Sequence, residues 1–292
     1  MSRSAGIIKI AVVVLLAMII FTVPLVGQSL WLKHNHKPAI SLEFYKIKYE
    51  RDPWYGTQIY NTKLFNMTAF LSAYIPTSHD LGVVFEIPYT NFSIQAPDAS
   101  MEWGNYSENS IGNPYIGIEY ENPEQNFIST VGIRFPLASE ENPYALLQGM
   151  RTESDRAEAF EVKRLAIYAS AVYNYRSPEG LTLRFGLGPL ASIPTKTGEY
   201  DTELYLRYFS QLWTEAGNFS MAAGLTGFFW LTGEDLNLGE GTFHHINLAG
   251  FYQFGMFRPG LFFAAPLDAN LSYIKDYTYG FSLTLEFENS FR

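Results

Sequence analysis

The chain of 292 residues contains no cysteine, so its fold has no disulfide and it offers no thiol for catalysis, metal binding or lipid attachment. Charged residues are also scarce, at 17 %, below the share usual in soluble domains. The 20 basic residues are outnumbered by 29 acidic ones, and the net charge of −9 argues against nucleic acid as a partner. Mean hydropathy is near zero, which excludes a bundle of membrane helices but not a barrel with one apolar and one polar face.

Aromatic residues, in contrast, are abundant. They make up 16 % of the chain, with 20 Tyr and 23 Phe. Aromatic and β-branched side chains suit a pleated, half-buried surface, so the composition favours an all-β protein.

A single long apolar run occupies residues 10–23, after two basic residues and no acid. This order is typical of a secretory signal peptide, predicted at 1–27, with Gly27 before the cleavage site; cleavage after Ser29 also fits. An uncleaved membrane anchor is the alternative. Both interpretations predict export, and residues 28–38 are then predicted to form a periplasmic N-terminal segment.

Beyond residue 38 the dominant period is two. At the C-terminus Phe281, Leu283 and Leu285 alternate with Ser282, Thr284 and Glu286, as a strand with one apolar face requires. The same pattern predicts twelve strands, at 39–48, 64–75, 81–95, 113–121, 126–136, 163–176, 180–192, 201–213, 217–231, 243–254, 259–266 and 277–291.

The connections between these strands alternate between short turns and long polar loops. Outer-membrane barrels have short periplasmic turns, long outer loops and an even number of strands. We therefore expect residues 39–292 to form a closed antiparallel up-and-down transmembrane β-barrel of about twelve strands in a bacterial outer membrane. A soluble β-sandwich or lipocalin-like barrel is the alternative. Phe291, one residue from the end, resembles the aromatic signal of outer-membrane barrels and implies the barrel-assembly machinery as a partner.

Two adjoining segments carry a family resemblance. The stretch 110–120 (SIGNPYIGIEY) precedes 126–135 (NFISTVGIRF) and Pro136. A Gly-containing turn, a strand, a hairpin and a second strand ending in Phe-Pro resemble the outer-membrane porin-like and transporter proteins linked to meta-pathway phenol degradation. The resemblance covers about 30 residues and implies a barrel channel. Asn113-Pro114 stands where many relatives carry an acidic residue.

Charged residues on the polar faces are candidates to line the lumen, because Arg or Lys at the bilayer midplane costs about 2–4 kcal/mol. The predicted pore-lining residues are Arg134, Arg164, Arg184, Arg207, Glu86, Glu119, Glu286 and Glu288, with Glu43 as a further candidate. Closing the sheet would set arginines opposite glutamates. In one interpretation, the electric field between the arginines and the glutamates orients polar or anionic solutes in the lumen. In the other, the charges pair with each other and their side chains fill a narrow barrel.

The longest loop, 137–162, contains two helix-compatible pieces, 144–151 and 155–162. It either folds inward and constricts the lumen or lies on the surface.

Enzymatic motifs are sparse. No histidine stands two residues before a serine, as in outer-membrane phospholipases, and no nucleotide-binding loop or serine elbow occurs. His244 and His245 should point to opposite faces of one strand, so at most one serves any site. His34 and His36 alone do not make a metal site.

We therefore expect no catalysis, cofactor or metal. The predicted function is passive diffusion of a small polar, anionic or hydrophobic solute across the outer-membrane lipid. The first alternative is a non-conducting barrel whose long extracellular loops bind a partner or ligand, and a membrane-embedded hydrolase ranks third.

Overall fold

The computed structural model describes residues 37–49, 63–95, 105–122, 124, 126–178, 180–196, 201–232, 241–268 and 275–288. The strands within them are β1 (Ala39–Lys48), β2 (Lys63–Pro76), β3 (Leu81–Gln95), β4 (Tyr106–Ile111), β5 (Tyr115–Asn122), β6 (Phe127–Arg134), β7 (Arg164–Arg176), β8 (Leu181–Pro194), β9 (Glu203–Ala216), β10 (Phe219–Trp230), β11 (Thr242–Tyr252), β12 (Phe257–Pro266) and β13 (Tyr277–Glu286). An α-helix, α2 (Pro143–Thr152), and a 3₁₀ helix, η1 (Ser154–Ala159), lie between β6 and β7. None of the described helices is both long and apolar enough to span a bilayer.

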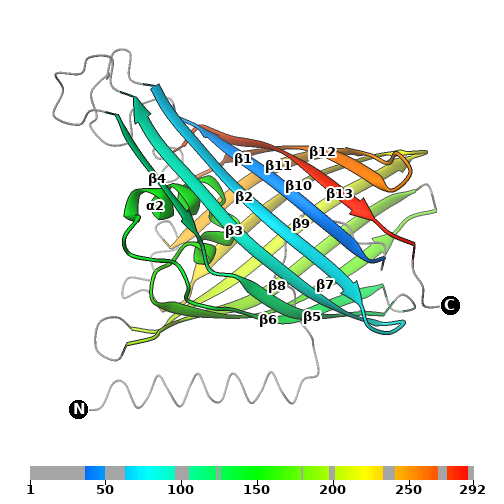
Figure 1. Cartoon of the computed structure of the whole chain (residues 1–292). Helices are drawn as coiled ribbons and strands as arrows, with labels where there is room; N and C mark the ends of the chain where they lie inside the picture. The colour runs from blue at the N-terminus through cyan, green and yellow to red at the C-terminus, as the bar shows by residue number, and fades with distance from the viewer. Residues whose placement is uncertain are drawn as a thin grey trace, which may run out of the picture.

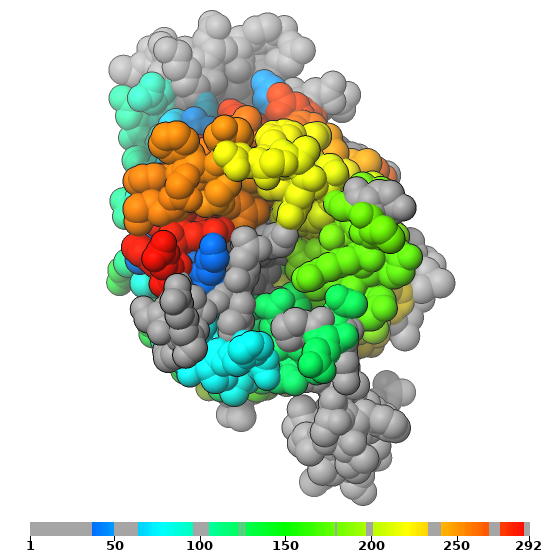
Figure 2. Space-filling model, turned by 90° about the vertical axis from the view of Figure 1, so that its right-hand side faces the viewer, coloured from blue at the N-terminus to red at the C-terminus, as the bar shows by residue number. Residues whose placement is uncertain are grey.

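The strands form one closed antiparallel ring (Figure 1). Apart from β4 and β5, neighbours in sequence pair with each other, and the pairing of β1 with β13 completes the ring. β5 and β4 pair with successive halves of β3, so these thirteen strands occupy twelve positions. Figure 2, seen along the barrel, shows the strands following one another around the ring in chain order. The predicted closed barrel of about twelve strands is confirmed.

The outward face of the barrel is apolar and the inward face is polar. On β13, Phe281 is 48 % exposed, whereas Ser282, Thr284 and Glu286 are buried. Outward apolar side chains recur on other strands, at Leu71, Phe85, Ile118, Val131, Leu187, Leu248 and Leu261. Removing such surface from water is favourable, so this exterior suits a hydrocarbon environment.

The ends of the barrel differ. The short connections lie at one end, which we call the turn end, and the long ones lie at the opposite end, the loop end. Gly180, Gly217 and Gly255 adopt positive φ in three of the short turns, a conformation that glycine adopts at little cost.

One predicted loop, the stretch 96–112 between two predicted strands, and one predicted strand, 277–291, need correction. The stretch predicted as loop at 96–112 contains β4, and β13 ends at Glu286, not at residue 291. β4 was missed because two of its outward residues, Ser107 and Asn109, are polar, so that Ile111 alone gives no apolar alternation. The predicted signal peptide (1–27) lies outside the described residues, as do His34, His36 and Phe291, and these assignments stay predictions.

Candidate functional site

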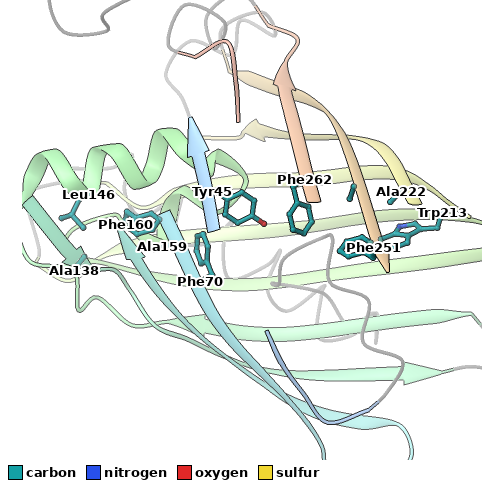
Figure 3. Packing of buried hydrophobic residues seen from close by; sticks show 11 residues of the cluster. Tyr45, Phe70, Ala138, Leu146, Ala159, Phe160, Trp213, Ala222, Phe251 and Phe262 are labelled. Carbon is teal, nitrogen blue, oxygen red and sulfur yellow. The ribbon is translucent and has the colours of Figure 1, made fainter. Parts of the chain in front are cut away.

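Residues 135–163, which we call the plug, fold into the barrel from the loop end. Leu146 of α2 and Phe160 are buried against the inner wall, next to Phe70 of β2 and Tyr45 of β1 (Figure 3). The wall also binds the plug backbone: Thr90 Oγ1 donates to the Ala145 carbonyl at 3.0 Å. Of the two alternatives for this loop, the inward position is the observed one.

The plug is clamped at both ends by Asn113, which is fully buried at the break between β4 and β5. Its Nδ2 atom donates to the carbonyls of Glu158, at 3.0 Å, and Glu161, at 2.6 Å. Its Oδ1 atom accepts from the Ala138 N–H at 2.8 Å. One side chain therefore joins the entry of the plug to its exit.

The start of α2 is held by a carboxylate from the wall. Asn142, at the N-cap, makes no side-chain capping bond. Instead, Glu108 Oε2 of β4 accepts from the N–H groups of Tyr144, at 2.9 Å, and Ala145, at 3.0 Å. The first N–H groups of a helix lack intrahelical partners and carry partial positive charge, so a carboxylate there stabilises the helix.

A buried charge network joins η1 to the barrel wall. Arg156 of η1 lies 2.7 Å from Glu86 Oε2 on β3 and 3.1 Å from Glu43 Oε2 on β1. Arg134 of β6 lies 2.6 Å from the second oxygen of Glu86. Glu158 of η1 accepts hydrogen bonds from Arg207 on β9 and from the Tyr168 hydroxyl on β7. Buried charges are tolerated only when paired, so these contacts fix the plug in one position.

A row of aromatic rings runs from the plug toward the turn end through the otherwise polar interior (Figure 3). Its members are Phe160, Phe70, Tyr45, Phe262, Phe251 and Trp213. Successive ring centroids are 5.9, 6.1, 5.7, 5.5 and 5.7 Å apart. These are favourable spacings for aromatic pairs. The Arg156 guanidinium carbon lies 3.4 Å from the Phe70 centroid, which ties the charge network to this row.

The predicted lining residues occupy different places. Arg134 and Glu86 pair with each other, and Arg207 contacts the plug. Arg164 lies 2.7 Å from Ser192 Oγ, and Arg184 lies 3.2 Å from Asn174 Oδ1. Glu119 accepts from Thr130 at 3.3 Å, and Glu286 lies 3.5 Å from Arg258. Glu288 is exposed and lies beyond the end of β13.

The sequence did not single out Asn113, Arg156 and Glu158 as functional residues. The sequence did contain a signal for Arg156 and Glu158, because residues 153–164 combine several charges of both signs with a pattern that is compatible with a helix. That pattern is equally typical of a solvated surface loop. That the charged side chains of the inner wall line a conducting path stays a prediction.

Comparison with known proteins bears on the fold. No protein-family model and no curated protein sequence matches the chain, so the family resemblance stays a prediction. Among solved structures, the COG4313 outer-membrane channel from Pseudomonas putida F1 has a TM-score of 0.55 and 11 % identity, over 90 % of this chain and all of that one. LpxR from Salmonella typhimurium (10 % identity, 85 % of this chain and 100 % of that one) and the CymD monoaromatic hydrocarbon channel (11 %, 87 % and 89 %) both have TM-scores of 0.45. The chain thus shares the barrel fold of the first of these proteins.

Proposed function

We propose that the chain is a narrow, plug-restricted channel for small solutes in the bacterial outer membrane. The location is supported by the apolar exterior, which would face lipid, and by the closed ring of paired strands, since hydrocarbon offers no hydrogen-bond partners to backbone groups. Assembly would use the barrel-assembly machinery. Permeation needs no covalent step, cofactor or metal.

The observation that carries the proposal is the way in which the plug is held. Its contacts to the wall include ion pairs from η1 and hydrogen bonds from α2 and Asn113, alongside the apolar contacts of Leu146 and Phe160. When the plug moves aside, water in the lumen can solvate these polar groups and offset part of the lost contacts, whereas an all-apolar interface would gain nothing from water, so such a plug can shift as a unit. A shift of η1 would leave Glu43, Glu86, Arg134 and Arg207 facing the lumen, where they can interact with passing solutes.

Single-channel recording of the refolded full chain in planar bilayers tests this function. We expect small conductance steps from the wild type and longer or larger openings from Arg156→Leu, which loses both wall contacts. A heat-dependent gel shift confirms that each variant is still a closed barrel. Folded barrels of both proteins with no conductance at any voltage would refute the channel.

The second candidate is a non-conducting barrel. It is favoured by the burial of Arg134 and Arg156, since a guanidinium with saturated partners more often fills a space than lines a path. Liposome swelling with small sugars and amino acids separates the two functions, because only a channel accelerates solute entry.

A further inference from the structure

A small, partly open cavity of about 20 Å³ lies between η1 and the wall formed by β1, β11, β12 and β13. That volume holds about one water molecule. Its lining includes Ser154 and Asp155 of η1, His245 of β11 and Lys275, which lies two residues before the start of β13. Tyr45 and Phe262 provide an apolar side. The plug and the wall thus bring four chemically active side chains to one point.

Three of these side chains, Ser154, His245 and Asp155, have the order of a nucleophile, a base and an orienting acid. Ser154 Oγ lies 3.2 Å from His245 Nε2. On the other side of the ring, His245 Nδ1 lies 3.5 Å from Asp155 Oδ1 and has no hydrogen-bond partner among the described residues. Hydrogen bonds of this kind are often long in a resting site and shorten when substrate binds. A serine is activated when a histidine can take its proton and an acid holds that histidine.

Further contacts hold the acid and place a positive charge at the serine. Asp155 Oδ2 accepts from Thr226 Oγ1 at 2.8 Å, and Thr226 Oγ1 accepts from Asn247 Nδ2 at 2.9 Å. Lys275 Nζ lies 2.7 Å from Ser154 Oγ. Burial lowers the pKa of Lys275 to about 8, so its ammonium still predominates at neutral pH. A fixed cation at this point stabilises negative charge that develops on an attacked carbonyl.

We propose that Ser154, His245, Asp155 and Lys275 form a site for acyl transfer from small carboxylic esters. Ser154 Oγ attacks the ester carbonyl and gives its proton to His245 Nε2. The bond to the leaving alkoxide breaks, and the alkoxide takes that proton. Water then adds to the acyl-serine with His245 as base, which releases the acid and restores the serine. Asp155 positions the ring, and Lys275 faces the oxyanion.

The test uses the refolded full chain in detergent micelles, with a small fluorophosphonate probe and p-nitrophenyl acetate. We expect the probe to label Ser154, as identified by peptide mass spectrometry, and ester hydrolysis to show an initial burst. Ser154→Ala and His245→Gln should lower both by at least about 100-fold, the usual scale for loss of a nucleophile or general base. Asp155→Asn should shift the pH profile of hydrolysis, an effect that a purely structural contact does not produce.

Ser41→Ala is the matched control, because Ser41 is another buried inward serine, bonded to Thr284 at 2.9 Å and not to a histidine. It should leave labelling and hydrolysis unchanged. The proposal is overturned if the folded wild type is not labelled at Ser154, or if Ser154→Ala hydrolyses the ester as fast as wild type. Both readouts are independent of conductance, so a failed channel and a failed esterase give different results.

Discussion

Replacing Asn113 with alanine should release the plug while leaving the barrel closed. The substitution removes the bonds to the Glu158 and Glu161 carbonyls and to the Ala138 N–H. At about 1 kcal/mol net for each hydrogen bond, the closed position loses about 3 kcal/mol. Since every 1.4 kcal/mol is tenfold, the released population should rise about 100-fold. The β-ladder pairs do not include Asn113, so the ring itself should persist.

Limited trypsin digestion in detergent measures this release, because the plug contains Arg151, Arg156 and Lys163. When opening is fast relative to cleavage, the rate of cutting follows the open population. Asn91→Ala is the matched control: Asn91 donates to the Glu108 carbonyl of β4 at 3.3 Å, within the barrel wall, and among the described residues it makes no hydrogen bond to the plug. A cleavage rate for Asn113→Ala within about threefold of Asn91→Ala, with both barrels still heat-modifiable, would refute the clamp, since threefold corresponds to less than one hydrogen bond.

Three further perturbations probe other features. Arg156→Leu leaves Glu43 buried without its guanidinium partner and should destabilise the closed plug by about 3–5 kcal/mol, seen as faster trypsin cleavage than in Asn113→Ala. Leu187→Arg, on the outward face of β8, should cost about 2–4 kcal/mol in urea titrations of folding into vesicles, whereas Phe254→Arg in a short turn should cost about 0–1 kcal/mol; equal costs would contradict a lipid-facing exterior. Burial raises the pKa of Glu153 in the plug to about 7, although the positive charge of Arg156 acts to lower it. The closed plug therefore binds this proton more tightly than a released plug does, and the resulting stabilisation is complete below the ordinary pKa and lost as the pH rises through 7. Openings should become more frequent from pH 5 to pH 8, and Glu153→Gln should remove that dependence.

All the strands except β4 could be predicted because each of them carries its own apolar alternation. β1 and β3 have the predicted bounds, since aliphatic and aromatic residues face lipid along most of their length. β4 could not be found this way, because Ser107 and Asn109 on its outward face are polar. The contacts of the site depend on partners far apart in the sequence: Arg156 meets Glu43 across 113 positions. No local pattern records which carboxylate a given arginine will reach.

His244 and His245 show the same difference between what a local pattern predicts and what depends on distant contacts. Strand geometry correctly placed His244 and His245 on opposite faces: His244 contacts Asp268 at 3.0 Å, and His245 is buried inside. The proximity of Ser154 to His245 arises only because the plug enters the barrel. The sequence leaves the direction of that loop open, since its mixture of charged and apolar residues suits either solvent or a polar lumen.

β4 has a consequence for how the protein can be truncated. It pairs with β3 alone among the described strands, because β6 ends at Arg134 opposite Tyr115. The edge of β4 that does not pair with β3 therefore faces α2, whose N-terminal N–H groups donate to Glu108. Free strand edges recruit other strands. Deleting residues 135–163 would therefore expose the second edge of β4 to other strands at the same time as it widens the lumen. Conductance from misassembled or associated barrels could then be mistaken for conductance through an open pore.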